Sequence, residues 1–512
     1  MRSPVLSRRN FLSTAVLTSL ALRAGRLVAW APSAPVTARS PLGPLVGEEA
    51  DGVRIFRGVP FAQPPVGPLR FHPPVSLRPW TAPRQATRFA AAAMQTGAAA
   101  VPRSEDCLYL NVWAPAGQGP HPVYVWIHGG GFTNGRSFDP MFDGAMLARE
   151  GIVCVTIAYR LGVFGFLELE PLLGPSYAGS ANNGVRDIIA ALQWVQQNIE
   201  SLGGDPERVT VGGESAGAKL TCTLLGVPSA KTLFQQGVSE SGGGERVATQ
   251  QESERVARAF GELWKTSTGK SLAALTTAPA ASLLPVQARF MREWPHHFPL
   301  RPRLEKLFLP RMPVEGMAAG LSRGRRLLIG TNLQESAYFL GPHPEHDPTS
   351  ANVGNLPLPQ FLAVERRYKN VYPEMTEAER RIRALTAEEY WVPSVRAANA
   401  HVAGGGAAWM YRLDFHEGSG RMGAYAFHSR DLRLVWDGPS AAAADPQAEA
   451  KLARAMHEAW CAFLRGQAPA AASLPVWPQY SESRRPTMIL NTQSRVEDRP
   501  NEAELRLWDG VM

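Results

Sequence analysis

The sequence has little cysteine and, after its first segment, no long apolar run. Four cysteines in 512 residues are too few for the disulfide framework with which small secreted domains replace a core. No later apolar stretch approaches roughly twenty residues, so no stable membrane span is expected in the mature chain. The motifs HExxH and CxxC, and a GxGxxG in a dinucleotide-binding context, are also missing. No metal and no organic cofactor is therefore expected.

The amino-acid composition is otherwise that of an ordinary globular protein with many turns. Hydrophobic residues make up 45% and charged residues 19% of the chain, which is enough apolar material for a large core. The 47 glycines and 43 prolines indicate many turns and ordered loops. The net charge of +8 is unevenly spread, because residues 1–31 hold five arginines and no acid. Without them the charge is +3, which gives no electrostatic case for binding nucleic acid.

The N-terminus has the pattern of an export signal. The pair Arg8-Arg9 precedes an uncharged apolar stretch, residues 11–22, that is too short to span a bilayer but fits the core of a signal peptide. The pair resembles the twin-arginine export signal of bacteria, and Ala-Trp-Ala at 29–31 is a cleavage site of the A-x-A type. We therefore expect residues 1–31 to be a signal peptide and the mature protein to be periplasmic or secreted. The alternative is a disordered basic N-terminus.

Short apolar runs alternate with longer amphipathic runs through the rest of the chain. The runs that fit buried strands are residues 123–127, 152–157, 209–211, 327–330 and 408–415. The runs with helical periodicity are residues 185–199, 216–225 and 448–464. This alternation predicts an α/β fold for residues 32–512, with a mostly parallel central sheet flanked by helices and a site at the carboxyl ends of its strands. Residues 355–400 are a candidate for a helical, lid-like insertion.

The run Gly-Glu-Ser-Ala-Gly at 213–217 is a G-x-S-x-G motif between a predicted strand and a predicted helix. A nucleophilic serine needs a sharp strand-to-helix turn that exposes its hydroxyl, and the crowded backbone there admits only small residues two positions to either side. The helix N-terminus also favours negative charge that develops near the serine. The motif alone occurs by chance in chains of this composition, so its position between strand and helix carries the argument.

A second motif, His-Gly-Gly-Gly at 128–131, directly follows the first predicted strand. Three glycines leave backbone N–H groups unobstructed by side chains, so that these groups can point at an oxygen anion. The N–H groups of Gly130 and Gly131, together with that of Ala216, would form an oxyanion hole beside Ser215. The alternative for this run is a flexible tight turn.

A serine hydroxyl needs a base, and the base needs a carboxylate to orient it. In sheets of this type the order along the chain is serine, acid, histidine. The candidate bases are His343, His346, His401, His416, His428 and His457. The candidate acids are Glu335, which closely follows a predicted strand, and Asp347 and Asp414. These patterns alone leave both positions open.

Longer motifs point to a family. Residues 56–62, 104–111, 159–166 and 203–206 resemble, in the correct order, signature blocks of the type-B carboxylesterases, the family that includes the cholinesterases. The resemblance runs from about residue 40 to 510. It implies an α/β-hydrolase fold with helical and loop insertions around the active site. It also implies hydrolysis of a small-molecule carboxylic ester through an acyl-enzyme.

The resemblance also assigns roles to single residues. It carries Ser215 as the nucleophile, Glu335 as the triad acid and His428 as the base, with Gly130, Gly131 and Ala216 as the oxyanion hole. Two further residues would support the triad from nearby, namely Glu214 beside the nucleophile and Ser241. A plain turn serine is nearly as good an explanation of Ser241. Nothing in the sequence indicates the oligomeric state.

The chain departs from the family pattern in two places. Cys107 lies where many members form a disulfide, but its partner position is Ala93, so Cys107 is expected to be a free, buried thiol. Residues 96–103 lack the tryptophan with which cholinesterases hold a choline head, so choline esters are not the expected substrates.

Two other functions are compatible with the sequence. One is a specialised hydrolase of an amide, a lactone or a polyester-like toxin side chain, because loops set the acyl and alcohol pockets. The other is a non-catalytic binding protein on the same scaffold, which competent residues at all three triad positions disfavour. The aromatic candidates for pocket walls are Trp294, Phe298, Phe339 and Trp391, although core packing is the commoner role of such residues.

Overall fold

The computed structural model describes residues 33–97, 101–295, 298–340, 356–418, 422–437 and 444–512. The predicted signal peptide, residues 1–31, therefore lies outside the described residues, and so do His343, His346 and Asp347. None of the helices in the described ranges combines the length and the hydropathy needed to cross a bilayer.

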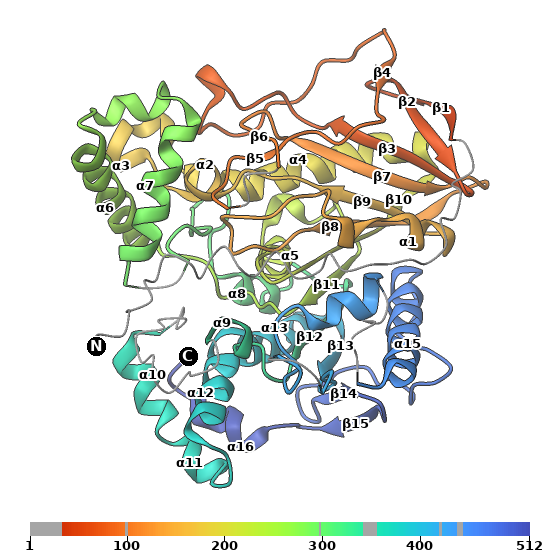
Figure 1. Ribbon diagram of the computed structural model, residues 1–512, viewed down its shortest axis with the longest axis vertical. Coiled ribbons are helices and arrows are strands. Elements are labelled where there is room, and N and C mark those ends of the chain that lie inside the picture. Colours follow the sequence, from red (N-terminus) through yellow and green to blue (C-terminus); the bar gives the residue numbers. More distant parts are fainter. Residues whose placement is uncertain (1–32, 98–100, 296–297, 341–355, 419–421, 438–443) are drawn as a thin grey trace, which may run out of the picture.

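A large twisted sheet forms the centre of the described structure (Figure 1). In spatial order its strands are β1 (Ala34–Ser40), β2 (Gly43–Ala50), β3 (Val53–Pro60), β7 (Tyr109–Pro115), β9 (Val153–Ile157), β8 (His121–Ile127), β10 (Gly204–Glu214), β11 (Gln236–Glu240), β12 (Arg326–Asn332), β13 (Ala407–Leu413), β14 (Pro486–Leu490) and β15 (Arg495–Asp498). The short β4 (Arg84–Gln85) pairs with β2, and β5 (Ala92–Ala93) pairs with β6 (Arg103–Ser104) apart from this sheet. Strands β9 to β14 run parallel, whereas both ends of the sheet are antiparallel.

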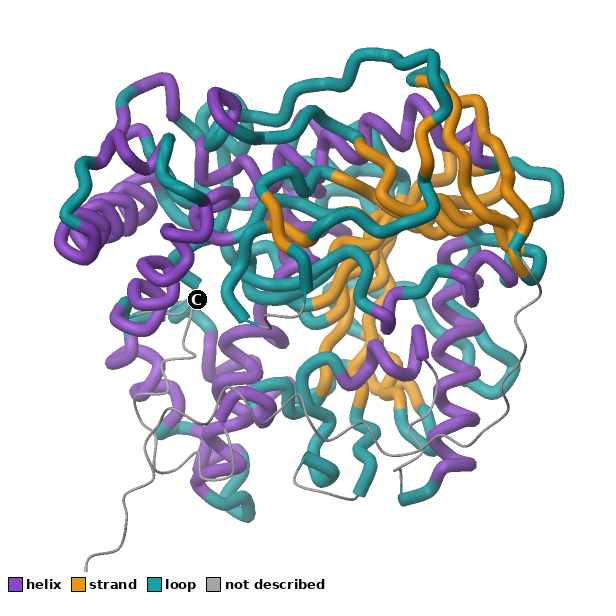
Figure 2. The backbone as a smooth tube through the Cα atoms, turned by 45° about the horizontal axis from the view of Figure 1, so that its top comes forward, coloured by secondary structure: helices purple, strands orange, loops and turns teal. Residues whose placement is uncertain are grey.

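Helices cover both faces of the sheet (Figure 2). Their bounds are α1 (Ala145–Arg149), α2 (Gly162–Phe166), α3 (Glu170–Leu173), α4 (Asn183–Asn198), α5 (Ala216–Leu225), α6 (Gln250–Thr268), α7 (Ala280–Glu293), α8 (Pro313–Ala318), α9 (Ala337–Leu340), α10 (Leu358–Glu365), α11 (Tyr368–Val371), α12 (Glu377–Thr386), α13 (Val392–Ala403), α14 (Arg430–Leu432), α15 (Pro446–Leu464) and α16 (Glu502–Leu505). Two π-helical turns, Ala387–Trp391 and Arg433–Asp437, precede α13 and follow α14. The predicted α/β architecture is confirmed.

The alternation of side chains along β8 explains the two covered faces. Val125 and Ile127 are fully buried in one core cluster, which also contains residues of α4 and α5. Tyr124 and Trp126 point to the other side and pack in a second cluster with residues of α1 and α15. Because successive residues of a strand face opposite ways, a strand buried on both faces is apolar throughout, as the sequence of β8 is.

The insertion predicted at residues 355–400 is helical. It comprises α10, α11 and α12 and continues into α13, and in Figure 1 the first three of these helices lie together at the lower left. A third apolar cluster, which includes Phe361, Tyr368, Leu385 and Trp508, holds α10 to α12 against the C-terminal α16 region. This arrangement gives the insertion a core of its own beside the sheet.

Candidate active site

Ser215 occupies a sharp turn between β10 and α5. Its backbone has φ 55° and ψ −120°, a conformation that is strained for a side chain of this kind. The N–H of Ser215 donates to the carbonyl of Glu240 at 2.9 Å, which anchors the turn to β11. A Cβ at Gly217 would lie 2.0 Å from the carbonyl oxygen of Ile127, and one at Gly213 would lie 2.4 Å from the same atom. Both glycines of the motif are thus required by close backbone contact.

The glycine run after β8 lies beside this serine. Gly130 and Gly131 have positive φ values of 107° and 61°. A Cβ at Gly130 would approach the carbonyl oxygen of Asn134 to 2.2 Å, so the bend needs glycine there. Within the described ranges, no hydrogen bond is recorded from the N–H groups of Gly130, Gly131 or Ala216. These three donors are available to a ligand oxygen.

Glu335 and His428 form a buried pair. Glu335 follows β12, and His428 lies on the segment that follows β13. Nδ1 of His428 lies 2.7 Å from Oε2 of Glu335, and the backbone N–H of His428 donates to the backbone carbonyl of Glu335 at 3.2 Å. This contact fixes the imidazole and leaves Nε2 as the nitrogen that can take up a proton.

Two donors hold the other oxygen of Glu335. The Ser241 hydroxyl donates to Oε1 at 2.5 Å, and the N–H of Asn332 donates to the same atom at 2.7 Å. Ser241 itself has a positive φ of 57°, and its N–H donates to the carbonyl of Gly330. Ser241 is therefore a direct partner of the carboxylate and not a plain turn serine.

Glu214 faces the other side of the imidazole. Its Oε1 lies 3.1 Å from Nε2 of His428 and accepts a hydrogen bond from the Ser429 hydroxyl at 2.5 Å. Among the described residues, no hydrogen bond joins the Ser215 hydroxyl to His428. The structure thus brings the histidine, its acid and Glu214 into direct contact, while the contact between serine and histidine remains a prediction.

Burial dominates the protonation of these groups. It raises the pKa of Glu335 to about 7, although the donors Ser241 and Asn332 favour the charged form. Burial also raises the pKa of Glu214 to about 7, against the attraction of His428. It lowers the pKa of His428, which favours the neutral imidazole. A neutral imidazole is the form that a general base requires.

Comparisons with known proteins identify the family of the chain. Residues 34–508 match the carboxylesterase family. A para-nitrobenzyl esterase of Bacillus subtilis is 36% identical over 91% of this chain and 96% of its own, and a pig liver carboxylesterase is 30% identical over 97% and 96%. Among solved structures, a carboxylesterase of Geobacillus stearothermophilus superposes with a TM-score of 0.81 and 32% identity over 92% of this chain and 99% of its own.

The chain belongs to the carboxylesterase family. It has the α/β-hydrolase fold that the resemblance implied, and it is a serine carboxylic-ester hydrolase. The similarity extends over almost the whole described structure of this esterase.

The esterase has a large cavity at the carboxyl ends of its parallel strands. Its volume is about 1270 Å³, and Ser215, His428, Gly130 and Gly131 all line it. The walls that are far from these residues in sequence come from the end of α7 and from the region of α9. Trp294, Phe298 and Phe339 belong to these walls. Trp391 does not line this cavity and is buried in the core, which is the commoner role that the sequence analysis gave for such residues.

The other candidate bases and acids that the structure describes lie outside the cavity of the esterase. His401 is buried against Ser322, and His457 contacts the carbonyl of Val435. His416 is exposed, and Asp414 is bound by Arg412 at 2.6 Å. None of these four candidates lines the large cavity.

The expected free thiol is confirmed. Cys107 is buried and unpaired, and Ala93 lines the same small cavity as Cys107. The esterase thus has an alanine where a disulfide partner would have to stand.

One residue of the site had no role in the sequence interpretation. Lys219 lies one helical turn after Ser215 and is buried behind the Glu335 carboxylate. The only signal in the sequence is a lone lysine in an apolar helix, a pattern that also fits a solvated lysine at a helix surface.

Proposed function

We propose that Ser215, His428 and Glu335 are the catalytic triad of this esterase and that the N–H groups of Gly130, Gly131 and Ala216 form its oxyanion hole. The observation that carries the proposal is the 2.7 Å contact between His428 and Glu335 in a cavity that Ser215 also lines. Glu214 and Ser241 support the imidazole and the carboxylate from either side.

In the proposed reaction His428 takes the proton of the Ser215 hydroxyl as the serine oxygen attacks the ester carbonyl. The three N–H groups hold the oxyanion, and the imidazolium then protonates the leaving alcohol. Water repeats the sequence on the acyl-enzyme and releases the acid. Since Nε2 faces Glu214 at 3.1 Å, the first step needs a small rotation of the imidazole toward Ser215.

The substrate is a small-molecule ester whose acyl and alcohol groups the cavity selects. A relative from Sphingopyxis macrogoltabida, a fumonisin B1 esterase, is 34% identical over 88% of this chain and 85% of its own. We therefore keep a specialised toxin ester as a second substrate class beside simple carboxylic esters. A panel of esters that varies acyl length and alcohol size distinguishes the two.

The test of the triad is the substitution Ser215→Ala. We expect it to lower kcat/KM for p-nitrophenyl acetate by roughly 10⁴-fold and to abolish labelling by a fluorophosphonate probe. The matched control is Ser483→Ala, which removes an exposed hydroxyl and should change neither. Wild-type turnover by the Ser215→Ala variant would contradict the proposal, and failure of the wild type to react with the probe would favour a binding protein.

A further inference from the structure

Lys219 is a cation buried directly behind the triad. It lies on α5, where its N–H donates to the carbonyl of Ser215 at 3.0 Å. Its side chain is only 5% exposed, and its Nζ lies 2.9 Å from Oε1 of Glu389. Glu389 is also bound by Arg246, whose Nε lies 3.2 Å from the same oxygen. Burying an ammonium group is costly unless it is paired, so this position calls for a functional explanation.

Tyr390 connects this cation to the base. The Lys219 Nζ lies 4.5 Å from the centre of the Tyr390 ring, within the range of a cation–π interaction. The same ring lies 4.9 Å from the imidazole of His428, with an angle of 40° between the two planes. Lys219, Tyr390 and His428 are thus linked by two consecutive contacts, and the aromatic ring supports the imidazole on the side that α5 approaches.

Charged groups from several elements surround Lys219, Tyr390 and His428. Glu214, Glu240 and Glu335 lie at or just after the carboxyl ends of β10, β11 and β12. The segment before α6 contributes Glu245 and Arg246, and the π-helical turn before α13 contributes Glu388 and Glu389. Asp431 lies on the segment of His428. Carboxylates outnumber cations here. Lys219 is therefore a positive charge in surroundings that are rich in carboxylates, and it acts on Glu335 in addition to the donors Ser241 and Asn332.

We propose that Lys219 is a positioning residue of this esterase, which holds Tyr390 against His428 and, as a cation near Glu335, favours the charged carboxylate and the unprotonated imidazole over their protonated forms. The proposal rests on the triad proposed above. Lys219 touches no substrate and acts only through Tyr390, Glu335 and the imidazole.

The direction of its effect follows from the charges. Lys219 lowers the pKa of Glu335 and also that of His428, because a cation favours the charged carboxylate and opposes a second cation. Burial and Arg246 lower the pKa of Lys219 itself to about 7, so its charge is present mainly below that pH. The effect is therefore greatest on the acidic limb of the activity profile, where His428 takes up its proton.

The test compares the pH dependence of kcat/KM in wild type, Lys219→Met and Lys219→Arg. Methionine keeps the length without the charge, and Glu389 retains Arg246 as its partner. We expect Lys219→Met to move the acidic limb upward by about half a pH unit to one unit, which lowers kcat/KM at pH 6 about three- to tenfold. At pH 9, where Lys219 is uncharged, the two proteins should agree within about twofold.

Controls separate this role from packing and from the triad itself. Lys219→Arg restores a charge and should bring the limb back toward the wild-type position, and Lys265→Met, on the exposed face of α6, should leave it unchanged. A uniform loss at every pH, or an equal shift in both Lys219 variants, would overturn the proposal. If the acidic limb of the wild-type kcat/KM profile does not arise from protonation of His428, the proposed triad is overturned instead. The Ser215→Ala labelling experiment tests the triad separately.

Discussion

The contact between Glu214 and Nε2 of His428 means that the imidazole has a carboxylate on each side. Glu214 raises the pKa of His428 and so favours its protonation, the opposite of the effect of Lys219. Two groups this close titrate as a pair that holds a shared proton. The position of the acidic limb therefore depends on the balance between the neighbouring carboxylates, Glu214 among them, and the cation Lys219.

The substitution Glu214→Gln removes the anion but keeps an oxygen that can accept from Ser429. We expect the acidic limb of kcat/KM to move to lower pH by about half a unit to one unit, because the remaining imidazole is protonated less readily. The measurement is the same pH profile used for Lys219. An upward shift would show that Glu214 does not act on His428 through its charge.

The sequence predicted the candidate site unevenly, for physical reasons. The serine turn could be predicted because a Cβ at Gly213 or Gly217 would lie only 2.0–2.4 Å from the Ile127 carbonyl oxygen, so both positions need glycine and leave a fixed pattern in the sequence. His428 could not be separated from five other histidines without the resemblance, because its partner lies 93 residues away. Lys219 was missed because a sequence shows a lysine but not the carboxylate that permits its burial.

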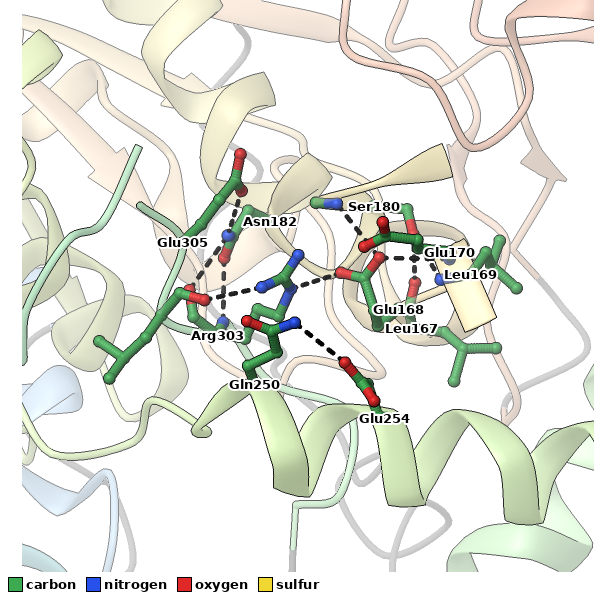
Figure 3. A network of polar contacts seen from close by, with 12 residues as sticks. Leu167, Glu168, Leu169, Glu170, Ser180, Asn182, Gln250, Glu254, Arg303 and Glu305 are labelled. Atoms are coloured by element: carbon green, nitrogen blue, oxygen red, sulfur yellow. Dashed lines mark hydrogen bonds and ion pairs between the residues drawn. The ribbon is translucent and has the colours of Figure 1, made fainter. Parts of the chain in front are cut away.

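At the scale of elements, a polar network joins the segment around Arg303 to residues that precede α3 and α4 (Figure 3). Arg303 lies on the segment that follows Phe298, and its Nε lies 2.5 Å from Oε2 of Glu168. Asn182 clamps the backbone of Arg303, accepting from its N–H at 3.0 Å and donating to its carbonyl at 3.1 Å. This network ties the segment to the residues just before α3 and α4, and Phe298, which lines the cavity, lies five residues before Arg303 on the same segment.

We expect Arg303→Met to lower the free energy of unfolding by about 3–5 kcal/mol, because Glu168 would be left buried without its cation. Urea denaturation measures this loss. The matched control is Arg289→Met on α7, where the ion pair with Glu293 is exposed and should contribute less than about 1 kcal/mol. Equal losses in the two variants would show that burial of the Glu168 pair does not matter.

The lining of the cavity contains as many arginines as glutamates, namely Arg292, Arg430 and Arg433 beside Glu214, Glu293 and Glu417. The carboxylates of the cavity wall already have partners, namely Glu214 with His428, Glu293 with Arg289 and Glu417 with Arg430. Arg433 also lines the cavity, is half-buried, and forms no ion pair with any residue that the structure describes. A partly buried guanidinium of this kind attracts an anionic group of the substrate.

We expect the esterase to prefer a p-nitrophenyl ester whose acyl chain ends in a carboxylate over a neutral ester of equal length. Arg433→Gln should lower that ratio of kcat/KM values about three- to tenfold, whereas Arg258→Gln, on the exposed side of α6, should not. A ratio that is unaffected by Arg433→Gln and by added salt would contradict this role.

At the scale of the whole molecule, the order of strands shows what a single sequence can and cannot reveal. The apolar runs of β8, β9, β12 and β13 predicted a parallel sheet, since strands covered on both faces leave no polar side. The antiparallel edges were not predicted, because β1 and β2 carry exposed and half-buried residues and so lack a continuous apolar run. Register and strand order depend on contacts between segments far apart in the chain, which local patterns do not encode.

The state of the four cysteines is relevant to the export that the sequence predicts. All four are buried and none forms a disulfide. Burial raises the pKa of Cys222 to about 11 and that of Cys461 to about 12, so neither is a reactive thiolate at neutral pH. A core without disulfides can be completed in a reducing compartment, which is consistent with the proposed twin-arginine export of a folded chain.

We therefore expect no thiol of the native protein to react with Ellman's reagent within minutes, and all four to react in guanidinium chloride. A reducing agent should leave the melting temperature unchanged, because there is no disulfide whose loss could lower it. The control is Ser483→Cys, which places one exposed thiol on the surface and should give one rapid equivalent. Rapid reaction of native wild-type thiols, or a lower melting temperature under reduction, would show that the core opens or is cross-linked in a way that contradicts this structure.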